Sequence, residues 1–119
     1  MRWYPEDVWR YVLKCQWRRI EQEEAFAGRC AEAGDELGSR VVAARLVREV
    51  MHLAFLLERQ YMPYSKWLGT GFARLECASN LQPALMGALN ATEMAGTRTR
   101  SPLVRAARRS VRPADVSVL

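Results

Sequence analysis

Residues 57–75, LERQYMPYSKWLGTGFARL, decide how this chain divides into helices. They close a long apolar helical pattern, which Pro63 ends because proline lacks a backbone N–H and fixes φ. Proline suits the first position of a helix, so another helix is expected from there to about residue 78. The stretch also gathers aromatic side chains and a lysine at one corner, which is either part of the core or faces a ligand: Tyr61, Tyr64, Lys66 and Trp67.

The helix that precedes this corner is predicted to be the central one. It is expected to begin near Ser39, a residue type that caps helix N-termini, and to run to about Met62. Residues 41–61 contain no glycine or proline, and apolar side chains occupy most of their helical circumference. Residues 28–40 contain three spaced glycines, so they are expected to connect this helix to the one before it.

An N-terminal helix is predicted from Pro5 to about Phe26, because two acids follow the proline and favour the positive end of a helix. Its apolar side chains cover an arc of roughly 240°, much wider than the stripe of an ordinary surface helix. They are Val8, Trp9, Tyr11, Val12, Leu13, Cys15, Trp17 and Ile20. We therefore expect two covered sides. One would be its own bundle, and the other a fourth helix, a second copy or protein absent from this chain.

The charge of the chain is concentrated at its C-terminal end. Residues 1–94 hold 12 Lys+Arg and 12 Asp+Glu, whereas residues 95–119 hold six Arg and one Asp. A last short helix is expected from about Pro83 to Ala91. We predict an all-α, up-and-down bundle of three to four helices over residues 1–94. Residues 95–119 would be a disordered basic tail, or else the translation of a shifted frame in a GC-rich gene. A neutral folded part argues against nucleic-acid binding.

The remaining composition excludes several classes of protein. Three widely spaced cysteines and a single histidine predict no metal site, no cofactor and no disulfide framework, which fits a reducing cytoplasm. The longest apolar stretch, residues 50–57, is too short to span a bilayer, and the N-terminus has no signal-peptide core.

One polar ridge interrupts the apolar central helix. Arg45, Arg48, His52 and Arg59 fall within roughly 40° on the helical wheel, with Glu49 beside them. Such a ridge could hold a phosphate or carboxylate. The alternative is ion pairing inside the bundle, because residues 21–36 carry six acids and one arginine.

Arg45 and His52 also fit the Arg-x6-His spacing of the HEPN helical ribonucleases. Leu46 stands where those proteins usually have a polar residue. A small RNA-cleaving or toxin-type protein is therefore the alternative functional hypothesis.

Three stretches together resemble the C-terminal helical half of a bacterial domain-of-unknown-function family. They are YPEDVWRYVLKCQWRRIEQEEAF, GDELGSRVVAARLVREVMHLAFLLERQYMPYSKWLGTGFARL and ECASNLQPAL, within residues 2–90. Full-length members join a nucleotidyltransferase-like domain to a helical bundle. That bundle is similar to the substrate-binding domains of kanamycin- and lincosamide-type nucleotidyltransferases.

The resemblance implies a non-catalytic domain that binds substrate or partner, in a chain truncated relative to its family. The Gly-Ser and Asp-x-Asp signature of a nucleotidyltransferase is missing, because Gly38-Ser39 has no such pair after it. The implied partner is a nucleotidyltransferase-like domain or a second copy bound through the first helix. A small-molecule groove beside the central helix would use Arg45, Arg48, Tyr64, Lys66 and Trp67, with Glu23, Glu24 and Asp35 as acidic groups.

Overall fold

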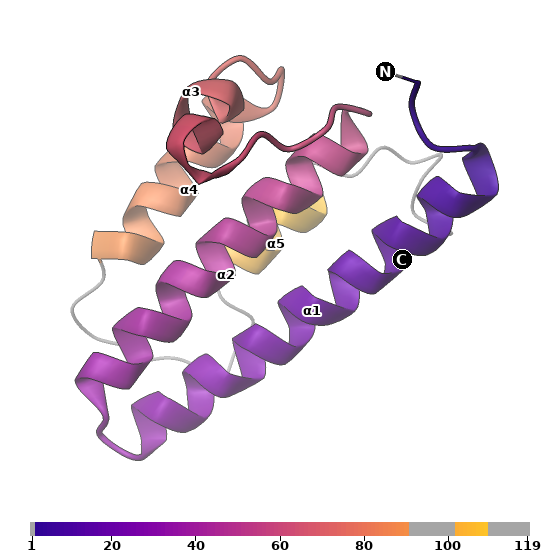
Figure 1. The fold of residues 1–119 in the computed structure, drawn as a ribbon. Helices are drawn as coiled ribbons and strands as arrows, with labels where there is room; N and C mark the ends of the chain where they lie inside the picture. The colour runs from indigo at the N-terminus through magenta and orange to yellow at the C-terminus, as the bar shows by residue number, and fades with distance from the viewer. Residues whose placement is uncertain (1, 91–101, 110–119) are drawn as a thin grey trace.

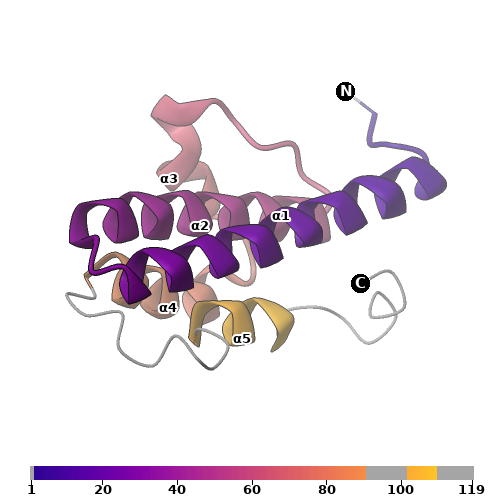
Figure 2. The same cartoon turned by 90° about the horizontal axis from the view of Figure 1, so that it is seen from below.

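The computed structural model describes residues 2–90 and 102–109 of the 119-residue chain. Its helices are α1 (Glu6–Glu32), α2 (Glu36–Leu57), α3 (Leu68–Phe72), α4 (Ala78–Asn90) and α5 (Pro102–Arg109), with a 3-10 turn, η1 (Ser65–Trp67), before α3. Helices α1 and α2 form an antiparallel hairpin, and α4 and α5 lie together against it (Figures 1 and 2). The prediction of an all-α bundle is confirmed.

The turn between α1 and α2 is shorter than the glycine pattern predicted. Helix α1 continues through Gly28 to Glu32, and Gly34 then takes a left-handed conformation with φ of +73°. Asp35 is the N-cap of α2, because its side chain accepts a 2.9 Å hydrogen bond from the Gly38 N–H. The prediction of Ser39 as the cap is therefore wrong. Aspartate supplies the same capping oxygen one turn earlier.

Helix α2 ends at Leu57 rather than at Met62. The Arg59 N–H bonds to the Leu56 carbonyl at 3.2 Å, and the Gln60 N–H bonds to the Phe55 carbonyl at 2.9 Å. This is the Schellman arrangement, which needs a left-handed residue at its centre; here that residue is Arg59, with φ of +57°. The chain is thus already out of helical conformation before Pro63, and the next turn begins only at Ser65.

Helix α4 begins at Ala78, so Pro83 lies inside it and not at its start as predicted. The two residues just before its first turn are held by a side chain from the end of α2. The Glu58 carboxylate accepts hydrogen bonds from the backbone N–H groups of Glu76, at 2.7 Å, and Cys77, at 3.0 Å. A carboxylate near backbone N–H groups at a helix N-terminus favours a helix start there. Helix α4 therefore begins five residues before Pro83.

Within residues 95–119, the structure describes only 102–109, which form α5. Leu103, Val104 and Ala107 are buried in the common core, while Arg105 and Arg108 are exposed. The prediction of disorder is wrong for these eight residues, because one turn of apolar side chains is enough to anchor a short helix on an existing core. The rest of that prediction lies outside the described residues.

The two core tryptophans of α1 are enclosed by the chain itself. Trp9 is 1% exposed and donates its indole N–H to the Leu56 carbonyl at 2.7 Å. Trp17 is 3% exposed, and the Arg108 guanidinium of α5 lies 4.9 Å from its ring centre. Helix α5 therefore reaches α1 on its Trp17 side, while Val8 and Tyr11 on another side of the helix stay exposed. No protein from outside the chain is needed to cover these two rings.

Candidate functional site

Polar contacts fix the register between α1 and α2. The buried Gln16 amide donates to the Glu49 carbonyl at 2.8 Å and also to the Glu49 carboxylate. One to two turns away, Arg45 forms an ion pair with Glu23. Because the helices are antiparallel, these contacts place Arg19 of α1 across from Arg48 of α2. The ridge predicted on α2 therefore lies along the seam between two helices.

Arg45 is already paired within the bundle. Its guanidinium donates to the Glu23 carboxylate, whose side chain is only 14% exposed. The alternative interpretation of the ridge, internal ion pairing with the acidic segment of α1, therefore holds for this arginine. Arg45 is thus occupied in the structure, whereas an Arg45–His52 ribonuclease pair would need its guanidinium free for phosphate.

Arg59 is also engaged, at the end of α2. Its guanidinium lies 4.1 Å from the Trp9 ring centre and donates to the Glu6 carboxylate at 3.1 Å. This hydrogen bond lowers the pKa of Glu6 below its ordinary value, although partial desolvation opposes the change. Arg59 thus covers a core tryptophan and stabilises the junction between the start of α1 and the end of α2.

The remaining ridge residues, Arg48 and His52, are joined by Arg19 from α1. Both arginines are exposed, and His52 is half-buried. Burial lowers the pKa of His52; the nearby Glu49 raises it, and the positive charges of Arg19 and Arg48 lower it further. The seam therefore presents two arginines beside an imidazole that favours its neutral form.

The aromatic corner does not join the ridge. Tyr64 and Trp67 are exposed, and the Lys66 ammonium lies 5.2 Å from the Trp67 ring centre. Across the described part of the chain, no hydrogen bond, ion pair or ring contact links these three residues to Arg45 or Arg48. Tyr61 serves packing, since its hydroxyl donates to the Arg2 carbonyl and its ring meets Trp3 and Tyr4.

The predicted acidic residues have separate positions. Asp35 caps α2, Glu23 pairs with Arg45, and Glu24 is half-buried on α1. Six of the eight residues chosen from the sequence are thus divided among a helix cap, an interhelical ion pair and an exposed corner, while Arg48 lies on the seam and Glu24 elsewhere on α1.

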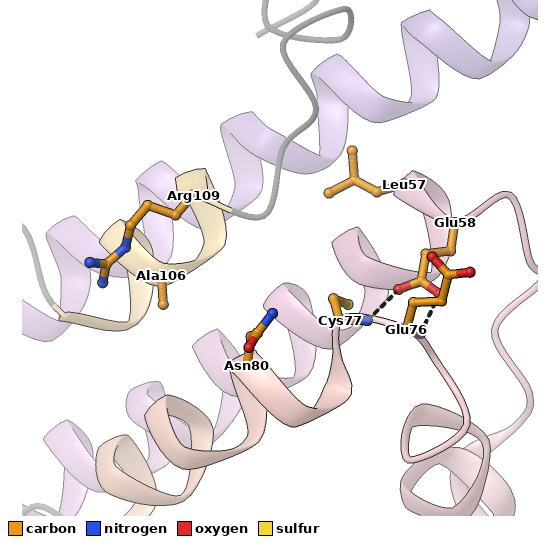
Figure 3. Close-up of a pocket in the computed structure, with 7 residues that line it drawn as sticks. All are labelled: Leu57, Glu58, Glu76, Cys77, Asn80, Ala106 and Arg109. Atoms are coloured by element: carbon orange, nitrogen blue, oxygen red, sulfur yellow. Dashed lines mark hydrogen bonds between the residues drawn. The ribbon is translucent and has the colours of Figure 1, made fainter.

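A cavity of about 600 Å³ lies elsewhere, between the end of α2, the start of α4 and α5 (Figure 3). It is lined by Leu57, Glu58, Glu76, Cys77, Asn80, Ala106 and Arg109. The Glu58 carboxylate in its wall holds the two residues just before α4, and the Arg109 side chain extends away from that carboxylate (Figure 3). Burial, reinforced by hydrogen bonding to Glu58, raises the pKa of the Cys77 thiol to about 12. This thiol is therefore protonated and a poor nucleophile at neutral pH.

Residues 2–90 and 102–109 bring no group of three or more His, Cys, Asp or Glu side chains close enough to hold a metal ion. None of their helices combines the length and apolar character that a bilayer span requires.

The fold and its surfaces define a small all-α bundle built on a long antiparallel hairpin, with an arginine-lined seam along that hairpin. The chain belongs to the family described as Domain of unknown function (DUF4037), whose sequence profile matches residues 1–68. The match covers α1, α2 and the aromatic corner. No curated protein and no solved structure matches the chain.

Proposed function

We propose that this chain is the non-catalytic helical partner domain of a nucleotidyltransferase-like protein and docks that protein's catalytic domain on α1. Membership of the family and the resemblance of residues 2–90 to its helical half support this assignment. The sequence holds no Asp-x-Asp pair, which two-metal phosphoryl transfer needs for its metal ions. Catalysis is therefore assigned to the partner.

The observation that carries the proposal is a second apolar face on α1. Val8 is 41% exposed and Tyr11 is 70% exposed, although the helix already buries Trp9 and Trp17 on its other side. Half-buried Cys15 continues this face at helical spacing, before exposed Arg19 and Gln22 interrupt it. An exposed apolar patch on a helix that is otherwise well packed is typical of a contact surface.

The border of this face limits what can dock on it. On the helical wheel of α1, exposed Lys14 and Arg18 lie beside this apolar face. The acid on the same flank, near the start of the helix, is Asp7. The complementary surface would be apolar with an acidic rim, since like charges facing each other across an interface cost binding energy. A second copy of α1 would place two such basic borders together, so the proposal commits to a different domain.

The test is a calorimetric titration with the separately expressed nucleotidyltransferase-like domain of a full-length DUF4037 protein. We expect binding to the wild-type chain and roughly tenfold or greater weakening in Tyr11→Glu and Val8→Glu. A charge buried at the centre of an interface costs several kcal/mol unless it is paired, and tyrosine is often an energetic anchor there.

The matched control is Tyr64→Glu. Tyr64 is 67% exposed, nearly the same as Tyr11, but lies at the corner before η1. This variant should bind like the wild type. Equal affinities for the Tyr11 and Tyr64 variants, or no heat with the wild-type chain, would refute docking on α1.

A further inference from the structure

We infer that Arg19, Arg48 and His52 form a binding site for a phosphate group on the seam between α1 and α2. The site borders the proposed docking face, because Arg19 lies one turn after Cys15 on α1, but it is tested with the isolated chain and phosphate, so either proposal can fail without the other. It differs from the ridge seen in the sequence, because it loses Arg45 and Arg59 and gains a residue from α1.

Two arginines of the predicted ridge already have partners within the fold. Arg45 is bound to Glu23, and Arg59 is bound to Glu6 and covers Trp9. Neither guanidinium is free to receive an incoming anion without breaking a contact of the fold. By contrast, the structure gives neither Arg19 nor Arg48 an ion pair or a hydrogen bond through its side chain within residues 2–90 and 102–109.

The register of α1 against α2 determines where Arg19 and Arg48 lie relative to each other. Gln16 meets Glu49, and Glu23 meets Arg45, so positions 19 and 48 lie at about the same height on the two antiparallel helices. Both positive charges act on His52, and an anion bound beside it would offset the repulsion between them. The two rows of N–H donors on rigid helices suit the tetrahedral oxygens of phosphate.

The third component is His52, one turn beyond Arg48 on the same face. Its ring is half-buried, and both arginines act on it electrostatically, so it lies within reach of the same anion. The acid that raises the pKa of His52 is Glu49, whose carboxylate accepts a hydrogen bond from the Gln16 amide, while Glu23, one turn after Arg19, is paired with Arg45. That hydrogen bond holds one oxygen of the Glu49 carboxylate toward Gln16 of α1.

The site predicts a specific response of the histidine. A bound phosphate would offset the two positive charges and accept a hydrogen bond from the protonated ring, so it would raise the pKa of His52. His52 is the only histidine in the chain, which makes its ring signals in an NMR spectrum unambiguous.

The experiment follows these ring signals while inorganic phosphate is titrated into the full chain, with chloride at matched ionic strength as the reference. The expected result is saturable shifts and a higher His52 pKa with phosphate than with chloride. A parallel titration with a nucleoside triphosphate shows whether the site takes the free ion or the phosphate of a nucleotide. Tighter binding of one of them identifies the source.

Variants make the assignment falsifiable. Arg19→Gln and Arg48→Gln should each weaken phosphate binding by roughly three- to fivefold, as expected for an exposed charge contact. The matched control is Arg18→Gln, which removes the same charge from the neighbouring position, about 100° around α1, and should have no effect. All three side chains are exposed, so the circular dichroism spectrum of each variant should equal that of the wild-type chain. An unchanged His52 pKa in phosphate, or equal weakening by Arg18→Gln, would overturn the site.

Discussion

The sequence predicted which arginines share the polar ridge better than it predicted their individual partners. The wheel placed Arg45, Arg48 and His52 on one face of α2, but it also included Arg59, which lies beyond the end of that helix. The acidic segment correctly suggested that some of these residues are paired. The wheel could not divide them, because pairing depends on the register of α1 against α2. Arg19 was missed for the same reason: nothing in its local sequence distinguishes it from Arg18.

Arg59 combines a left-handed backbone with a side chain stacked on Trp9. Arg59→Ala should lower the free energy of unfolding by about 1 kcal/mol, because the contact with Trp9 is lost while the backbone remains strained. Arg59→Gly should be roughly 1 kcal/mol more stable than the alanine variant, since glycine adopts this conformation at little cost. Urea denaturation of the two variants measures the difference. A glycine variant less stable than the alanine variant would contradict the Schellman assignment.

The second prediction concerns the pH dependence of His52. Its pKa is lowered in the folded chain, so the unfolded chain binds the proton more readily. The stability that neutral His52 contributes is therefore present above the unfolded pKa of about 6.5 and is lost as pH falls through and below it. NMR titration in chloride should give a pKa below 6.5. Chemical denaturation should show a shallower loss of stability over pH 7 to 5 in His52→Gln. A folded pKa above 6.5 would reverse the sign.

Helices were better predicted than their ends. Residues 41–57 are helical as expected, and so is the run from Glu6 to Phe26. The errors fell at Ser39, Pro63 and Pro83, where a residue suited to a helix start was taken for the start itself. In each case another group acts first: the Asp35 carboxylate, the left-handed turn at Arg59, or the Glu58 carboxylate on the start of α4. The last of these is a contact between distant segments, which local propensity does not contain.

A prediction for this element follows from the cap. Glu58→Ala should lower the free energy of unfolding by about 1–2 kcal/mol, because the N–H groups of Glu76 and Cys77 lose their acceptor. Glu58→Gln should cost less, since one amide oxygen remains. The same loss should speed alkylation of Cys77, whose pKa of about 12 depends partly on that carboxylate. Mass spectrometry after timed alkylation at pH 8 measures this effect. Unchanged labelling of Cys77 in Glu58→Ala would show that the carboxylate does not protect the thiol.

At the scale of the whole molecule, the all-α bundle followed from apolar periodicity alone, whereas its last helix did not. Residues 102–109 carry three arginines and only a short apolar stripe, so their composition resembles that of an unstructured tail. Their order comes from the surface that α2 and α4 present to Leu103 and Val104. Such a helix is stable only on an existing core, and sequence patterns weigh each segment by itself.

This dependence gives a stability prediction. Leu103→Ala should lower the free energy of unfolding of the full chain by roughly 2–4 kcal/mol, as expected for a buried leucine. Arg105→Ala, on the exposed side of the same helix, should change it by less than about 0.5 kcal/mol. Equal effects of the two substitutions in urea denaturation would show that α5 does not contribute to the core.

Oxidative footprinting of tyrosines can show whether a catalytic domain docks on α1. Tyr11 and Tyr64 are almost equally exposed in the isolated chain, so they should be oxidised at similar rates. On addition of the nucleotidyltransferase-like domain proposed above as the partner, the oxidation rate of Tyr11 should fall severalfold while that of Tyr64 stays unchanged. Protection of Tyr64 instead, or of neither residue, would contradict the account.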